Sequence, residues 1–149
     1  MRRPARLLAV AVAGVTLALG APSALAAGGH LSGGGTASIS QVAFNVTFGA
    51  SGTASGTFNC LMAGRSSFVL GAFGLKHIMK VQATPTNGLV TGSIASFSGP
   101  ARLIMDGGQH MNVDVSVWVN VATQQFQLTV IQVGAMPVET FSSGGVNLR

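Results

Sequence analysis

The stretch Gln109-His-Met-Asn-Val-Asp-Val-Ser-Val-Trp-Val-Asn-Val121 decides the fold class of this chain. From Met111 onward every odd position is apolar, whereas the even positions are polar apart from Trp118. A period of two places one set of side chains on each face of an extended strand, and no helix produces it. β-branched valine further favours an extended backbone. Residues 109–121 are therefore predicted to form a long β-strand with one buried face.

Shorter runs with the same period lie on both sides of this strand. They cover residues 42–48, 75–81, 101–105 and 126–130. Residues 90–97 are apolar on both faces in places, which is typical of a central strand. No stretch combines a helix cap with a 3.6-residue apolar stripe, so the chain is predicted to be all-β.

Turn residues separate these runs. Asn87-Gly88 and Asp106-Gly107 supply the positive φ angles that tight hairpin turns require. Gly99-Pro100 and the glycine pair within Ser142–Gly145 indicate further breaks. Short strands with frequent turns predict a single antiparallel β-sandwich or small β-barrel of about eight strands over residues 36–149.

The N-terminal 26 residues have the three parts of a secretory signal peptide. Arg2, Arg3 and Arg6 precede an apolar run, and Ala24-Leu25-Ala26 supplies the small residues of a cleavage site before Ala27. Residues 1–26 are therefore predicted to be removed, and the chain to be secreted to the periplasm or the extracellular space. Residues 27–35 hold five glycines and are predicted to be a flexible leader.

Charge excludes several classes of function. The formal net charge of +5 includes three arginines of the predicted signal peptide, and the five remaining cations are scattered along the chain. Such a distribution makes no phosphate-binding footprint, so we expect no nucleic-acid partner. The three acidic residues and three histidines leave few groups for acid–base chemistry. No glycine-rich phosphate loop and no nucleophile elbow is present, so we expect neither an enzyme nor a cofactor.

The segment from Asp106 to Asp114 gathers residue types that bind metals, including His110 and Asn112. On an extended strand His110 and Asp114 lie about 13 Å apart and cannot share one ion. We therefore predict no metal site here. Cys60 is the only cysteine, so no internal disulfide forms, and its place within an alternating run predicts a buried thiol.

The polar face of the long strand is the candidate ligand site. Asn112, Asp114, Trp118 and Asn120 share this face, where an indole platform beside amide and carboxylate groups is typical of glycan recognition. The alternative is that Trp118 packs under a loop or in a second core layer. A cavity lined by the eight Phe and the Met side chains would instead hold an apolar ligand, unless these side chains fill a solid core.

The small number of charges and of aromatic residues bears on how the chain would meet partners and membranes. Few charges protect exposed edges, so we expect either a closed barrel or edges that are covered by a partner or by self-association. A membrane barrel would need aromatic girdles, and the chain has no Tyr and one Trp. Stable membrane insertion is therefore not expected.

Several motifs resemble those of small exported bacterial β-rich proteins of unknown function. These motifs are the glycine cluster Gly33–Gly35, Phe44-Asn-Val-Thr-Phe48, Val90-Thr-Gly-Ser-Ile94, Val113-Asp-Val-Ser-Val117 and Phe126-Gln-Leu-Thr-Val130. In the similar proteins an acidic, glycine-rich loop often precedes the last of these strands. Here Asn120–Phe126 has neither acid nor glycine, so a ligand or ion that such a loop carries would be lost. The resemblance implies a β fold without an activity.

Together these patterns predict an exported, non-enzymatic structural or interaction module whose partner the sequence leaves open. A protein that binds a small apolar ligand or a glycan is the alternative.

Overall fold

A computed structural model describes residues 28–63 and 78–149 of the chain. Within these ranges it contains ten strands, two short 3₁₀ turns and no α-helix. The strands are β1 (Gly29–Ala37), β2 (Gln41–Phe48), β3 (Ala54–Ala63), β4 (Ile78–Ala83), β5 (Asn87–Thr91), β6 (Ile94–Met105), β7 (His110–Asn120), β8 (Gln125–Val130), β9 (Gly134–Ala135) and β10 (Glu139–Leu148). The turns are η1 (Ala50–Gly52) and η2 (Asp106–Gly108). The prediction of an all-β fold is confirmed.

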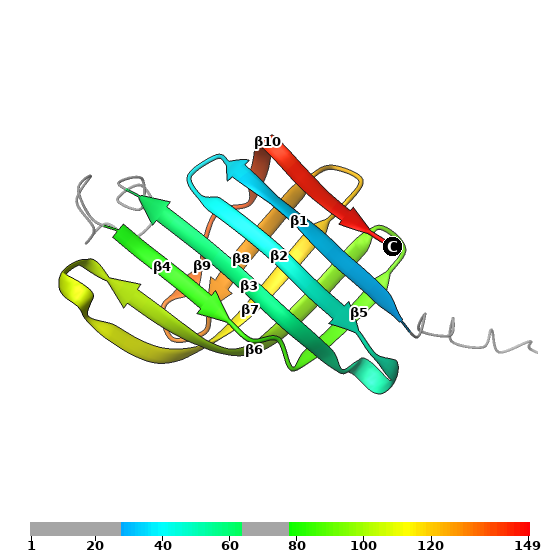
Figure 1. Cartoon of the computed structure of the whole chain (residues 1–149), viewed down its shortest axis with the longest axis horizontal. Coiled ribbons are helices and arrows are strands. Elements are labelled where there is room, and N and C mark those ends of the chain that lie inside the picture. Colours follow the sequence, from blue (N-terminus) through cyan, green and yellow to red (C-terminus); the bar gives the residue numbers. More distant parts are fainter. Residues whose placement is uncertain (1–27, 64–77) are drawn as a thin grey trace, which may run out of the picture.

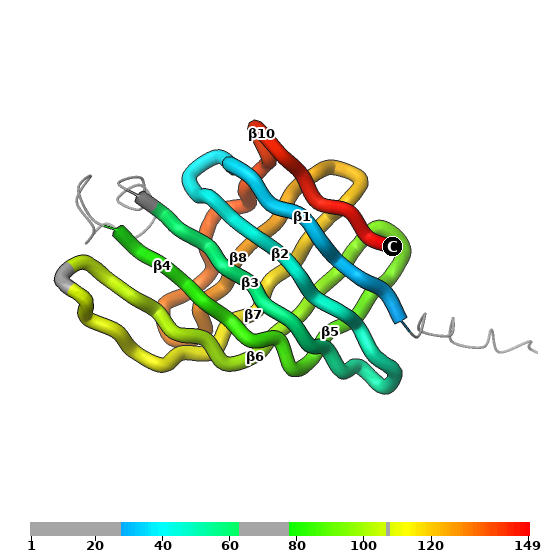
Figure 2. The backbone as a smooth tube through the Cα atoms, in the orientation of Figure 1, coloured from blue at the N-terminus to red at the C-terminus, as the bar shows by residue number. Residues whose placement is uncertain are grey.

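Eight of the strands close into a ring (Figure 1). The order is β10-β1-β2-β3-β4-β6-β7-β8, and β8 pairs again with β10. Neighbouring strands are antiparallel throughout, while β5 and β9 pair with β6 and β8 outside the ring. The closed ring makes the fold barrel-like. Strands β1 to β4 cross in front of β6, β7 and β8, which gives the ring two layers in this view (Figure 2).

The seam of the ring is short. Only Glu139 with Phe126 and Thr140 with Gln125 form Cα pairs between β10 and β8. Beyond these pairs, the side chain of Gln124 bridges the gap: its Nε2 donates to the carbonyl oxygen of Val146 at 2.9 Å, and its Oε1 accepts from the Val146 amide at 2.9 Å. One polar side chain thus replaces a rung of the sheet ladder.

Aromatic rings fill the inside of the ring. The ring centroid of Phe44 lies between 5.3 and 6.4 Å from those of Phe58, Phe97, Phe126 and Phe141, which come from four other strands. The alternation along β7 follows the prediction, since the four valines at positions 113–119 are buried and the residues between them are exposed or half-buried. Packed phenyl rings of this kind make up a hydrophobic core rather than a wall around a ligand.

The predicted flexible leader is wrong for residues 29–35, which form most of β1 and pair with both β2 and β10. The glycines allow this strand to lie close to its neighbours. A Cβ atom on Gly35 would come within 2.0 Å of the Ser143 carbonyl oxygen, and the φ of Gly35 is +153°. Glycine enrichment here therefore reflects a tightly packed strand and not a linker.

The boundaries around β5 and β6 also differ from the prediction. The expected strand over residues 90–97 is interrupted by a turn at Gly92, whose φ is +59°, and Asn87-Gly88 lies in β5 rather than in a hairpin turn. Strand β6 continues through Pro100. The Pro100 carbonyl accepts from the Thr84 amide, so the missing N–H of Pro100 faces the irregular connection between β4 and β5 and leaves the β7 ladder intact.

Strand β7 confirms the prediction for residues 109–121 to within one residue at each end. Met111 is the exception to its buried face, with 52% of its surface exposed. The glycines within Ser142–Gly145 do not end a strand, contrary to the prediction, but lie inside β10. The predicted signal peptide (residues 1–26) and the start of the predicted strand 75–81 (residues 75–77) lie outside the described residues. In the ranges that the structure describes, no helix is long and apolar enough to cross a membrane.

Candidate functional site

Two rows of side chains cross the outer face of β5, β6 and β7. They follow from the register of the three strands: Leu89, Ser96 and Trp118 form the first row, and Asn87, Ser98 and Ser116 form the second. Alternation turns these side chains away from the core, since Ala95, Phe97 and Val117 between them are buried. The outer face thus combines hydroxyl, amide, aliphatic and aromatic groups within a small area.

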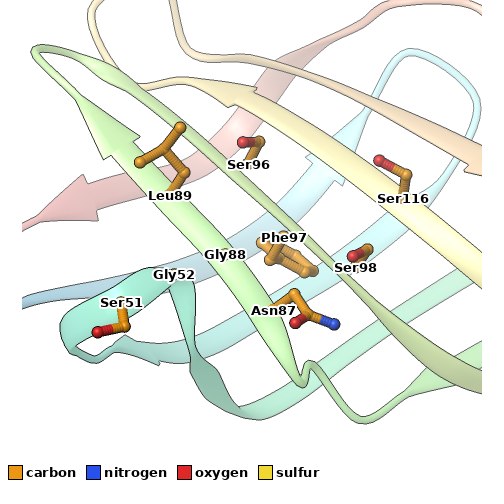
Figure 3. Close-up of a pocket in the computed structure, with 9 residues that line it drawn as sticks. All are labelled: Ser51, Gly52, Asn87, Gly88, Leu89, Ser96, Phe97, Ser98 and Ser116. Carbon is orange, nitrogen blue, oxygen red and sulfur yellow. The ribbon is translucent and has the colours of Figure 1, made fainter. Parts of the chain in front are cut away.

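A groove of about 510 Å³ lies on this face, over β5 and β6 (Figure 3). The η1 turn forms one side of it, and β7 contributes Ser116. The lining residues are Ser51, Gly52, Asn87, Gly88, Leu89, Ser96, Phe97, Ser98 and Ser116. None of them has an ionisable side chain. The volume is within the range of small-molecule sites, roughly 300–1,000 Å³.

The groove hydroxyls are available to a ligand. Ser96, Ser98 and Ser116 are half-buried, and no hydrogen bond joins their hydroxyl groups to another group in residues 28–63 and 78–149. The amide of Asn87 donates to Thr86 Oγ1 at 3.0 Å and keeps its carbonyl oxygen as an acceptor. Each serine hydroxyl both donates and accepts, so the groove offers several hydrogen bonds without any charge.

The structure places the four predicted site residues along the outer face of β7 but does not gather them. Asn112 and Trp118 are separated by six residues, about 20 Å of extended strand. None of the four lines the groove, although Trp118 borders it as the partner of Ser96. Asp114 and Asn112 are exposed and lie opposite Pro100 and Arg102, beyond the Ser116 end of the groove.

Asn120 has a structural contact that the sequence did not indicate. Its Oδ1 accepts from the amides of Ala122 at 3.0 Å and Thr123 at 3.2 Å. These bonds stabilise the turn between β7 and β8. Asn and Asp side chains commonly bond to amides two or three residues ahead in such turns.

The buried polar groups lie elsewhere, at the start of β10. Ser40 Oγ donates to both carboxyl oxygens of Glu139, at 3.0 and 2.9 Å, and the Ile39 amide donates to one of them at 2.9 Å. The pKa of the neighbouring Cys60 thiol is raised to about 12, chiefly by burial and also by the Glu139 charge, while a hydrogen bond with Ser40 opposes the shift. This thiol is therefore a poor nucleophile, as the prediction of a buried cysteine implies.

The described histidines lie apart from the groove. His110 Nδ1 is 3.4 Å from the Gly108 carbonyl oxygen, and His30 Nδ1 is 3.1 Å from Thr47 Oγ1. His77 lies outside the described residues. Over residues 28–63 and 78–149, no three His, Cys, Asp or Glu side chains are grouped as a metal site would require.

Sequence reasoning missed the groove because it missed the β5–β6 turn. If residues 90–97 form one strand, Leu89 lies before it and Ser96 near its far end, whereas the turn at Gly92 makes the two residues cross-strand partners. The Gly92-Ser93 pair, between two alternating runs, was the available signal. The serines at 96 and 98 also alternate with buried Ala95 and Phe97, a pattern that predicts an outer face.

Comparisons with models of protein families, with curated proteins and with solved structures gave no match for this chain.

Proposed function

We propose that this chain is an exported, non-enzymatic interaction module that binds its partner through the outer face of β5, β6 and β7. The observation that carries the proposal is the groove on that face. It has the volume of a ligand site, and three of its hydroxyl groups are without partners in the described ranges. A closed ring with a packed core supplies the rigid scaffold that such a site needs.

The packed interior supports a surface site over an internal one. A carrier of apolar ligands needs a cavity within its barrel. In this ring the side chain of Phe44 contacts four other phenyl rings across that space. Such contacts favour binding outside the ring, and we therefore rank the carrier function below surface recognition.

The groove chemistry supports recognition without catalysis. Acid–base and nucleophilic catalysis require a titratable group or an activated nucleophile near the substrate. The nine lining residues offer hydroxyls, an amide and apolar groups. The thiol of Cys60 is buried and has a raised pKa. For export, the support is the pattern of residues 1–26 alone.

A native mass spectrum of the chain purified from the medium or periplasm of its own host tests this function. We expect a mature species that begins at Ala27 and carries a bound partner. Ser98→Trp fills the groove and should abolish the adduct. Ser55→Trp, on the exposed face of β3, is the matched control and should retain it.

Two results would contradict the proposal. An adduct that survives Ser98→Trp would place binding away from the groove, and the absence of any adduct from the wild-type protein would remove the case for a ligand site. A species that retains Met1 in the exported fraction would contradict signal cleavage separately.

A further inference from the structure

We propose that the groove of β5, β6 and β7 binds a neutral glycan chain, with the Trp118 indole as an apolar platform at its border. This inference rests on the proposed function and names the class of ligand.

The lack of charge in the groove lining restricts the charge of the ligand. The groove lining contains no ionisable side chain, so a charged ligand would lose its hydration without gaining a counter-ion. Phosphate and carboxylate ligands are usually held by arginine, lysine or several backbone amides. The nearest ionisable groups on the same face of β6 and β7 are Asp114 and Arg102, both exposed and beyond Ser116. The groove therefore favours an uncharged ligand.

The spacing of the serine hydroxyl groups restricts the class of ligand further. Ser98 and Ser116 are direct cross-strand partners, with Cβ atoms about 5 Å apart. Ser96 lies two residues along β6, about 7 Å from Ser98. A ligand that bonds to all three hydroxyl groups needs polar groups at intervals of about 5 to 7 Å. Sugar hydroxyls satisfy this need, because they donate and accept as the serine hydroxyls do.

Apolar groups complete the match. Leu89 and Trp118 lie on the two sides of Ser96 in one row, which spans about 10 Å across three strands. A sugar ring has hydroxyls at its rim and C–H groups on its faces, so it gains from an aliphatic or aromatic surface beside hydrogen-bonding groups. A wholly apolar ligand would leave the three serine hydroxyls without partners.

The chain supplies its own probe for the test. It has one Trp and no Tyr, so its indole emission reports on Trp118 alone. We would titrate the mature chain with cellohexaose, maltohexaose, chitohexaose and soluble mannan, and with heparin as an anionic comparison. The expected result is a saturable shift of Trp118 emission with at least one neutral saccharide, confirmed by calorimetry, and none with heparin.

Variants locate the binding. Ser98→Ala and Ser116→Ala each remove one hydrogen bond and should weaken binding about fivefold, as loss of a typical hydrogen bond does. Ser55→Ala removes an exposed hydroxyl from the outer face of β3 and should change nothing. Trp118→Phe keeps an aromatic surface, and calorimetry should detect weakened but measurable binding, whereas Trp118→Ala should abolish it.

Three results would overturn the inference. These are no response to any neutral saccharide, a response to heparin alone, and binding that Ser98→Ala and Ser116→Ala leave unchanged. If the native adduct still disappears in Ser98→Trp and is a peptide, protein or lipid, the interaction function holds and the glycan assignment fails. If neither saccharides nor an adduct bind, both proposals fail.

Discussion

The side chain of Glu139 is 1% exposed, yet its carboxyl group accepts from two donors in the turn between β1 and β2, the Ile39 amide and the Ser40 hydroxyl, which both carboxyl oxygens share. It also lies at the first pair of the β8–β10 seam. One residue therefore ties the β1–β2 turn to the strand that closes the ring. No local pattern indicates this contact, because Glu139 lies in no alternating run and its partners are about 100 residues away.

Glu139→Ala should lower the free energy of unfolding by about 3 kcal/mol, because it leaves the half-buried Ile39 amide and the buried Ser40 hydroxyl without their acceptor. Urea unfolding measures this. Glu139→Gln keeps one acceptor oxygen and should lose less. Equal stability of the Ala variant and the wild type would show that these bonds do not secure the seam.

The raised pKa of the Cys60 thiol predicts how the stability of the fold changes at alkaline pH. Its pKa is raised from 9.0 to about 12 by burial, so folding holds the thiol in its neutral form. The corresponding stabilisation is fully present below pH 9 and is lost as the pH rises from 9 towards 12. Wild-type protein should lose stability between pH 9 and 11 more steeply than Cys60→Ala. Parallel pH profiles of the two proteins would refute this.

The same shift predicts reactivity. At pH 8 the native thiol should resist iodoacetamide for hours, and the unfolded chain should react within minutes, as intact mass measurements will show. Rapid alkylation of the native chain would mean that Cys60 is exposed in solution.

At the scale of elements, strand β1 shows what glycine content alone does not reveal. A glycine cluster next to a predicted signal peptide is typical of a linker, and only the pairing with β2 and β10 shows that it is a strand. Alternation over residues 42–48, 109–121 and 126–130 was sufficient to predict strands, because those strands bury one face. The runs through Pro100 and Gly92 were misread, since long-range pairing decides whether such residues end a strand.

Gly35→Ala should lower the free energy of unfolding by about 3 kcal/mol, because the new Cβ meets the Ser143 carbonyl oxygen and the φ of +153° suits only glycine. Gly29→Ala in the same strand is the control. A Cβ there has ordinary contacts of 3.6 Å or more, so stability should change by less than about 0.5 kcal/mol. Thermal unfolding of both variants compares them. Similar losses in the two would contradict the close approach of β1 and β10.

At the scale of the whole molecule, the ring of strands agrees with the first of the two expectations for the sheet edges, which were a closed barrel or edges covered by a partner or a second copy. Among the described strands, only the short β5 and β9 lie outside the ring. Strands β8 and β10 pair at two positions, and beyond these pairs the Gln124 side chain bonds to the backbone of Val146. Few backbone groups of the described strands therefore remain to recruit another copy. The candidate site was less predictable than the fold. Trp118 was proposed from its face on β7, whereas Ser96 and Ser98 come from β6, whose pairing with β5 depends on the turn at Gly92.

The chain from Ala27 onward should therefore be a monomer in solution. Light scattering coupled to size-exclusion chromatography over a range of concentrations tests this. A stable dimer would show that a surface outside the ring pairs with a second copy, and self-association would again be the leading expectation.

Recognition at the outer face of a closed, filled ring is the central claim, and the amide spectrum of the ¹⁵N-labelled mature chain tests it most directly. The spectrum would be recorded with and without the partner found on the native protein or, failing that, each neutral saccharide. We predict shifts at the single indole N–H of Trp118 and at amides of residues 87–98 and 116–118. Shifts confined to β1–β4, or none at all with a bound partner, would contradict it.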